Sequence, residues 1–120
     1  MKIQWPLHVA AGLGQRERIE QLLADGVDVN LPTRGWKNTP LVYAVGGGNL
    51  EIVRLLVERG ARIDARNAIG ATPLHVAAGQ GHTEIAAWLL EQEQSLRTAV
   101  DDEGYTPLDW ARSDAIRQLF

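Results

Sequence analysis

A Thr-Pro-Leu tripeptide recurs along the chain at an almost constant interval, and this repeat constrains the fold more than any other feature. Its copies begin at Thr39, Thr72 and Thr106, and a degenerate copy, Trp-Pro-Leu-His, begins at Trp5. The four prolines are spaced by 34, 33 and 34 residues (40 − 6, 73 − 40 and 107 − 73). Such a period is typical of stacked units, each too small to bury its apolar face alone. The sequence therefore predicts a stack of four units.

Three further residue types recur in phase with these prolines. Alanine follows each proline after four residues, and glycine and leucine follow the first three prolines after eight and sixteen residues. These residues are Ala10, Ala44, Ala77 and Ala111; Gly14, Gly48 and Gly81; and Leu22, Leu56 and Leu89. Because so many positions match, the period indicates a repeated structural unit rather than a chance recurrence of one tripeptide.

A single unit is predicted to contain two short helices. Thr72 can accept a hydrogen bond from a free amide of the first turn, and Pro73 then takes the first helical position, where its missing N–H costs nothing. Gly79 and Gly81 can end this helix, because glycine adopts positive φ angles freely. A second helix is predicted over about residues 83–92. Helices this short are unstable alone, so stacking must stabilise them.

The motif Thr-Pro-Leu-His-Val-Ala at residues 72–77 resembles the signature of the ankyrin repeat, whose period is about 33 residues. The resemblance extends over essentially the whole chain. It implies an all-α solenoid of stacked helix-turn-helix units with short β-hairpin finger loops between them. It also implies a single domain over residues 1–120, with units at about 1–33, 34–66, 67–99 and 100–120, the first and last of which are caps.

Departures from the repeat mark its irregular parts. The two 34-residue spacings are expected to place one extra residue in the finger before Pro40 and another in the finger before Pro107. The third unit has no glycine near Glu93, so its second helix is expected to run on. Trp88 occupies a position that is leucine in the preceding unit, and it is predicted to lie in the core.

The charge balance argues against a nucleic-acid partner. The chain has 12 Lys and Arg against 15 Asp and Glu, a formal net charge of −3, which is not the electrostatic footprint of a protein that binds phosphate backbones. The sequence contains no cysteine, which excludes disulfides and thiolate metal sites. No segment is apolar and long enough for a signal peptide or a membrane span, and we expect a cytoplasmic protein.

Three histidines, His8, His75 and His82, raise the alternative of a metal site or a general base. His8 and His75 hold the same motif position two units apart, and packed helices are separated by about 10 Å. They cannot share a zinc ion, whose bond to nitrogen is about 2 Å long. The family resemblance implies that the motif histidine holds hydrogen bonds around the threonine hydroxyl. We therefore expect structural histidines and no metal.

Two other segments suggest chemistry that their context does not support. The glycines at 46–48 lack the strand and the lysine of a phosphate-binding loop, and they are interpreted as a turn before Asn49, which can cap the second helix. The acidic residues at 101–103 lack the ligand spacing of a calcium loop, and they are interpreted as a solvated finger tip that can also contact a partner. We expect no cofactor and no enzymatic activity.

The fingers and first helices carry the candidate binding residues. An exposed aromatic side chain on a rigid scaffold is typical of a binding anchor, although Trp36 can instead fold back over the extra residue of its finger, and both interpretations stay open at this point. The predicted protein-binding residues are Trp36, Lys37, Asn38, Tyr43, Ala68, Ile69, Ala71, Asp102, Glu103, Tyr105 and Trp110.

These observations predict a non-catalytic module that binds another protein through the concave surface formed by its fingers and first helices. The chain is expected to be a monomer in isolation. The resemblance leaves adaptor and inhibitor roles open, including an immunity-type inhibitor. A structural role, in which stacks associate end to end, is the main alternative, and an enzyme subunit or small-molecule binder is a more distant one.

Overall fold

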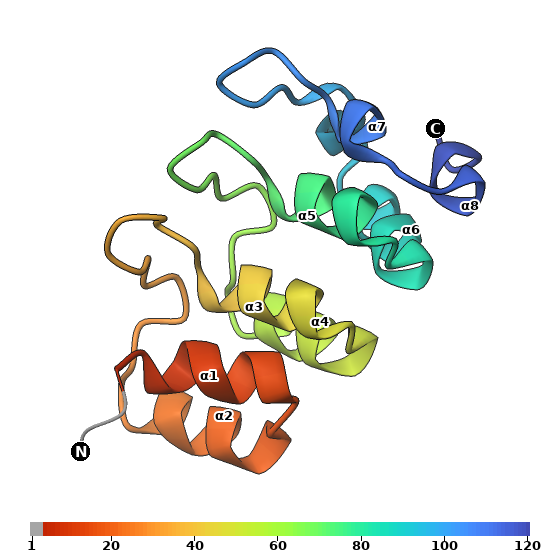
Figure 1. Cartoon of the computed structure of the whole chain (residues 1–120). Helices are drawn as coiled ribbons and strands as arrows, with labels where there is room; N and C mark the ends of the chain where they lie inside the picture. Colours follow the sequence, from red (N-terminus) through yellow and green to blue (C-terminus); the bar gives the residue numbers. More distant parts are fainter. Residues whose placement is uncertain (1–3) are drawn as a thin grey trace.

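The computed structural model describes residues 4–120, and within that range the chain is all-helical, with no β-strand (Figure 1). The predicted solenoid of helix-turn-helix units is thereby confirmed. The elements, in chain order, are α1 (Pro6–Leu13), α2 (Arg16–Ala24), α3 (Pro40–Gly47), α4 (Leu50–Glu58), α5 (Pro73–Gln80), α6 (Thr83–Gln92), the 3-10 helix η1 (Gln94–Thr98), α7 (Pro107–Trp110) and α8 (Asp114–Arg117).

The units stack with equivalent helices side by side. The first helices α1, α3, α5 and α7 pack against one another in sequence, and each of α1, α3 and α5 is backed by the second helix of its own unit. The loops that join one unit to the next project from one edge of the stack, at the left of Figure 1. The resulting molecule measures 40 × 27 × 23 Å.

The helices start and stop for the local reasons that the motif predicts. Thr72 caps α5 by accepting a hydrogen bond from the His75 amide, and the Asn49 side chain accepts from Ile52 at the start of α4. Gly81 ends α5 with a φ angle of 78°, a conformation that glycine adopts without strain. Gly79 lies inside α5, so the prediction that it also ends the helix is wrong.

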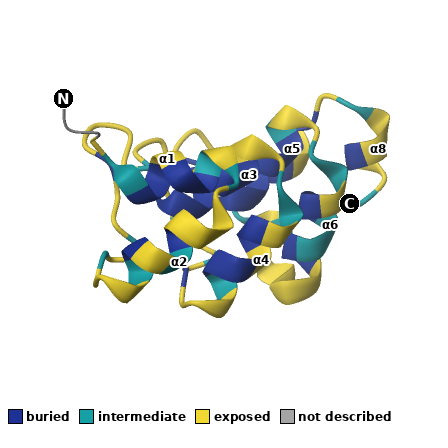
Figure 2. Cartoon of the chain, turned by 90° about the horizontal axis from the view of Figure 1, so that it is seen from below, coloured by how far each residue is buried: buried dark blue, intermediate teal, exposed yellow. Residues whose placement is uncertain are grey.

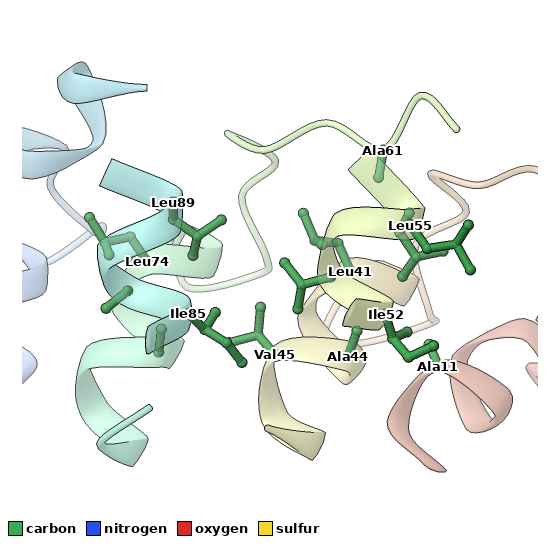
Figure 3. Close-up of a cluster of buried hydrophobic side chains, with 14 of the residues drawn as sticks. Ala11, Leu41, Ala44, Val45, Ile52, Leu55, Ala61, Leu74, Ile85 and Leu89 are labelled. Carbon is green, nitrogen blue, oxygen red and sulfur yellow. The ribbon is translucent and has the colours of Figure 1, made fainter. Parts of the chain in front are cut away.

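The core lies between the two helical layers and runs the length of the stack. Leu41 and Leu74, at the same position of α3 and α5, are completely buried. Ile52, Ile85 and Leu89 of the second helices join them in one cluster (Figure 3). Burying a leucine or isoleucine side chain contributes about 1.5–3 kcal/mol, so this cluster holds the units together. The connecting loops are mostly exposed (Figure 2).

The second helix of the third unit does not run on as expected. α6 ends at Gln92, and Glu93 is extended, with a φ angle of −149°. The Glu93 carboxylate accepts a hydrogen bond from the Ser95 amide and caps η1, which inserts Leu96 into the core. Trp88 is half-buried and packs against the edge of the core cluster, so its predicted core position is only partly correct.

Over residues 4–120, none of the helices has the length and apolar character that crossing a membrane requires.

Candidate functional site

Three hairpin-shaped loops, here called the first finger (residues 33–38), the second finger (67–71) and the third finger (101–105), form the projecting edge. In each finger, the amide of the first residue donates to the carbonyl of the last residue, over 3.0, 3.0 and 2.8 Å. A side-chain oxygen of the first residue then accepts from the amide of the last residue, over 3.1, 3.0 and 2.9 Å. The closing residues are Thr33, Asn67 and Asp101.

This geometry locates the extra residues of the two longer spacings. The closing residues stand 7, 6 and 6 residues before their prolines (40 − 33, 73 − 67 and 107 − 101), so the first finger does contain one extra residue. The third finger has the same length as the second. The extra residue expected before Pro107 therefore lies upstream of that finger, between α6 and Asp101, where the chain forms η1.

Neighbouring fingers are hydrogen-bonded to one another. The Trp36 carbonyl accepts from the Ala68 amide over 2.8 Å, and the Ile69 carbonyl accepts from the Asp102 amide over 3.0 Å. The Asn67 side chain also donates to the Asn38 side chain over 3.2 Å. The three tips therefore form one continuous and internally braced row.

The motif histidine of the third unit connects the helical layer to this row. His75 Nδ1 accepts from the Thr72 amide over 3.1 Å and lies 2.9 Å from the Thr72 hydroxyl, while Nε2 lies 2.8 Å from the Tyr105 carbonyl, to which it donates. Burial lowers the pKa of His75 below its ordinary value of 6.5, although the Tyr105 carbonyl and the Asp101 carboxylate act in the opposite direction. A neutral ring suits this network, and the predicted structural role of His75 is confirmed.

His8 holds the same position in the first unit with a reduced network. Its Nε2 lies 2.6 Å from the Leu31 carbonyl, and burial lowers its pKa as well. Among the residues that the structure describes, its Nδ1 has no hydrogen-bond partner. Within the same range, no group of three or more His, Cys, Asp or Glu side chains is arranged to hold a metal ion.

Most of the predicted binding residues reach the surface of the row. The exposed fractions of Trp36, Ile69 and Tyr105 are 63%, 41% and 51%. Trp36 therefore does not fold back over its finger. Exposed side chains also include Lys37, Tyr43, Ala68, Asp102 and Glu103, and Asn38 is half-buried.

Two predicted binding residues lie elsewhere. Ala71 is only 1% exposed, and its amide closes the second finger, so it does not belong to the candidate surface. Trp110 is half-buried, with its ring edge-on to that of His75 and its indole N–H donating to Asp101 over 2.9 Å. Its side chain therefore holds the first residue of the third finger in place.

Asp101 is a buried part of this support and not a solvated tip residue. Its carboxylate accepts from the amides of Glu103 and Tyr105, each over 2.9 Å, as well as from the Trp110 indole. Burial alone would raise the pKa of Asp101, but these three donors hold it below its ordinary value of 3.8. Only Asp102 and Glu103 remain as exposed acids at this tip.

Sequence reasoning did not select several exposed apolar residues on the first helices. Val9 occupies the position equivalent to Tyr43 and is 39% exposed, and Leu13 near the end of α1 is 69% exposed. The register could have identified Leu13, because the equivalent positions are Gly47 and Gln80. An apolar residue where other units have glycine or glutamine is not needed for the repeat itself.

Comparison with known proteins identifies a family with this architecture. A family model described as ankyrin repeats (many copies) matches residues 7–57 and 41–90. The B-cell lymphoma 3 protein homolog of Mus musculus is 33% identical over 109 residues, which cover 89% of this chain and 24% of that protein. The nuclear factor NF-kappa-B p105 subunit of Gallus gallus is 33% identical over 125 residues, covering 88% of this chain and 13% of that protein.

A shorter similarity has higher identity. Protein phosphatase 1 regulatory subunit 27 of Homo sapiens is 46% identical over 66 residues, which cover 55% of this chain and 42% of that protein. The matched part of this chain therefore spans less than half the length of each of these relatives.

Proposed function

Because this chain belongs to the ankyrin-repeat family, whose repeats mediate protein–protein interaction, we propose that it binds a partner protein along its finger row and the adjoining first helices. In this proposal, binding is the whole activity, and no catalytic group, metal or cofactor takes part. The cytoplasmic location and the monomeric state expected from the sequence remain part of it.

The observation that carries this proposal is the exposure of large apolar side chains on a hydrogen-bonded framework. Trp36, Ile69 and Tyr105 stand on successive fingers, with Val9 and Tyr43 exposed on α1 and α3. Aromatic residues of this kind are the usual energetic centres of interfaces. The hydrogen bonds within and between the fingers hold the finger backbone in place, so little backbone conformational entropy is lost on binding.

The charges at the two ends of the row support a defined orientation of the partner. Arg34 and Lys37 lie in the first finger, and Asp102 and Glu103 lie in the third. Such a gradient affects encounter rate and orientation more than affinity. The partner surface should therefore have acidic groups near the first finger and basic groups near the third.

We propose that this binding regulates the partner, as an inhibitor or an immunity-type protein would. One relative is a phosphatase regulatory subunit, and a non-catalytic module can regulate a partner by occupying its surface. Capture of the partner from the native extract, followed by an assay of that partner with and without this chain, tests the regulatory part of the proposal.

The surface itself is tested by two matched pairs of variants. Trp36→Ala and Tyr105→Ala should each weaken partner binding by roughly 1–4 kcal/mol in calorimetry, with the urea midpoint unchanged. Arg54→Ala on α4 and Glu91→Ala on α6 are the controls, because both side chains are exposed on second helices. If the controls weaken binding more than the finger variants do, the second helices form the interface and this proposal is wrong.

A further inference from the structure

A recess of about 430 Å³ lies between the stems of the first and second fingers. It is formed by two consecutive connecting segments, each of which leads out of one helix pair toward the next. This basic recess is lined by, among others, Asn30, Lys37, Thr39, Arg62, Asp64 and Arg66. It is separate from the row of aromatic side chains on the tips.

The basic recess is positively charged in a chain whose formal net charge is negative. Lys37, Arg62 and Arg66 line it, together with a single acid, Asp64, whereas the whole chain carries −3. A concave surface lined by one sign of charge concentrates the electric field and attracts ligands of the opposite sign. The recess therefore favours an anionic group.

Within residues 4–120, only one of these cations has a carboxylate partner. Arg62 Nε lies 3.5 Å from Asp64 Oδ1. The Arg66 guanidinium donates to the carbonyls of Gly70, over 2.7 Å, and Val100. These carbonyls hold the guanidinium against the segment that precedes the third finger, and among the described residues it forms no ion pair. Among residues 4–120, Lys37 forms no ion pair.

The walls of the basic recess are held in place before any ligand arrives. The Asn30 side chain donates to the Gly60 carbonyl over 3.0 Å and accepts from the Arg62 amide over 2.8 Å, which joins the two stems. Lys37 has a φ angle of 55°, in the left-handed region, and its amide donates to the Thr33 carbonyl over 3.1 Å. A non-glycine residue in this region is uncommon, and here the closed finger sets the direction of its side chain.

Thr39 lies at the inner wall of this recess. It is buried, and its Oγ1 has no hydrogen-bond partner in the part of the chain that the structure describes. In the third unit, the equivalent Thr72 hydroxyl is engaged by His75, but the second unit has Val42 at the histidine position. Because the Thr39 hydroxyl is closed off from solvent, it does not reach a ligand, and the recess offers an anion its exposed cations Lys37 and Arg62.

We propose that the basic recess binds a carboxylate of an acidic segment in a partner protein, as a contact additional to the finger tips. The three cations outnumber the single acid by two (3 − 1), so a bound carboxylate leaves one positive charge that a neighbouring carboxylate of the same acidic segment can balance. Asp64 at the wall repels a doubly charged phosphate more strongly. Duplex nucleic acid needs a run of cations along its closely spaced phosphates, which a recess of this size does not supply.

The probe is an acetylated and amidated hexaglutamate peptide, titrated into the ¹⁵N-labelled full chain and followed by NMR. The amides of Asn30, Lys37 and Arg62 should shift in a saturable way. The shifts should vanish at about 1 M salt, where charges are screened within about 3 Å. Lys37→Gln should weaken the binding roughly twofold to fivefold, and adding Arg62→Gln should weaken it further.

Arg54→Gln, on the exposed face of α4, is the matched control and should leave the binding unchanged. The proposal is overturned if these amides do not shift, or if Arg54→Gln weakens binding as much as Lys37→Gln does. It is also overturned if inorganic phosphate or a DNA oligonucleotide saturates the same amides at a lower concentration than the peptide does. Trp36→Ala should leave peptide binding intact, so this test is independent of the proposal for the finger tips.

Discussion

The third unit and the first two units begin their first helices with the same motif but with different interactions. In the third unit, Thr72 and His75 bond to each other, and His75 reaches the third finger. The first unit keeps His8 but has Trp5 in place of the threonine, and the second keeps Thr39 but has lost the histidine. Each of these two units therefore retains one half of the pair.

In both units, the residue that remains has a side-chain atom without a hydrogen-bond partner among the described residues. Within residues 4–120, His8 Nδ1 and Thr39 Oγ1 are the buried side-chain polar atoms without a hydrogen bond. Leaving such a group unsatisfied costs about 1–3 kcal/mol. In a repeat stack, stability is approximately a sum of unit and neighbour contributions. The comparison therefore indicates that the first two units are less tightly connected by hydrogen bonds than the third.

Apolar contacts compensate where the hydrogen bonds are missing. His8 lies between the rings of Trp5 and Tyr43, edge-on to both, at centroid distances of 5.5 and 5.3 Å. Aromatic pairs of this geometry contribute about 0.5–1.5 kcal/mol beyond the area that they bury. Val42 is buried and adds apolar surface to its unit. The first two units can thus tolerate the loss of these hydrogen bonds.

The largest effect on stability should come from substitutions in the core. In this comparison, the core is assumed to contribute equally to the stability of the second and third units. Leu41→Ala and Leu74→Ala should each lower the free energy of unfolding by about 2–5 kcal/mol, because both side chains are completely buried. Urea denaturation measures this, with Leu13→Ala as the exposed control. A loss below about 1 kcal/mol for Leu74→Ala would contradict the repeat register, and clearly unequal losses would place the difference between the units in the core.

Acidification should expose the difference between the two histidines. The pKa values of His8 and His75 lie below 6.5 in the folded chain. As the pH falls below 6.5, the unfolded chain therefore binds more protons than the folded chain does, and stability decreases. Asp101, whose pKa is held below 3.8, decreases it further in the same direction at lower pH. Urea denaturation at about pH 7.5 and about pH 5 measures the loss of stability that comes from the histidines.

Variants separate the two contributions. Protonated His75 Nδ1 would face the Thr72 amide that now donates to it, whereas His8 Nδ1 has no such donor among the described residues. His75→Gln should therefore remove more of the pH dependence than His8→Gln does. If both variants lose the same share of the pH dependence, burial of the histidines alone causes that dependence.

The sequence predicts the parts of this molecule that repeat. The in-phase prolines, leucines and glycines predict the stack, and the family resemblance implies the hydrogen-bond network of Thr72 and His75. The tips could be predicted to project, since fingers lie outside the helical layers. Trp36 illustrates the limit, because whether its side chain is exposed depends on packing that no local pattern encodes.

The failed predictions depend on contacts between distant segments. Ala71 and Trp110 share register positions with exposed residues. However, Ala71 is buried where the second finger closes, and the Trp110 indole donates to Asp101 of the third finger. The basic recess arises because residues about thirty positions apart, such as Lys37 and Arg66, meet between two fingers. The 34-residue spacing before Pro107 also did not predict where the extra residue lies, since a longer finger and a segment such as η1 are equally compatible with it.

The smallest effect should come from restoring the missing half of the pair in the second unit. Val42→His would place Nδ1 beside the Thr39 hydroxyl, and Nε2 could donate to the Ala71 carbonyl, which holds the register position of the Tyr105 carbonyl that accepts from His75. The new hydrogen bonds should contribute about 0.5–1.5 kcal/mol each, while the lost valine burial removes a similar amount. The net change in unfolding free energy should therefore be small.

The informative quantity is the coupling between positions 39 and 42, obtained from a double-mutant cycle. Val42→His, Thr39→Val and the double variant should be compared by urea denaturation at about pH 8, where histidine is neutral. We expect Val42→His to be about 0.5–1.5 kcal/mol more favourable with Thr39 present than with valine there. Thr39→Val alone should be neutral or stabilising, since it removes a buried hydroxyl without a partner. A coupling energy of zero would mean that the missing hydrogen bond does not distinguish the units, and apolar packing alone would then determine how strongly each unit holds the next.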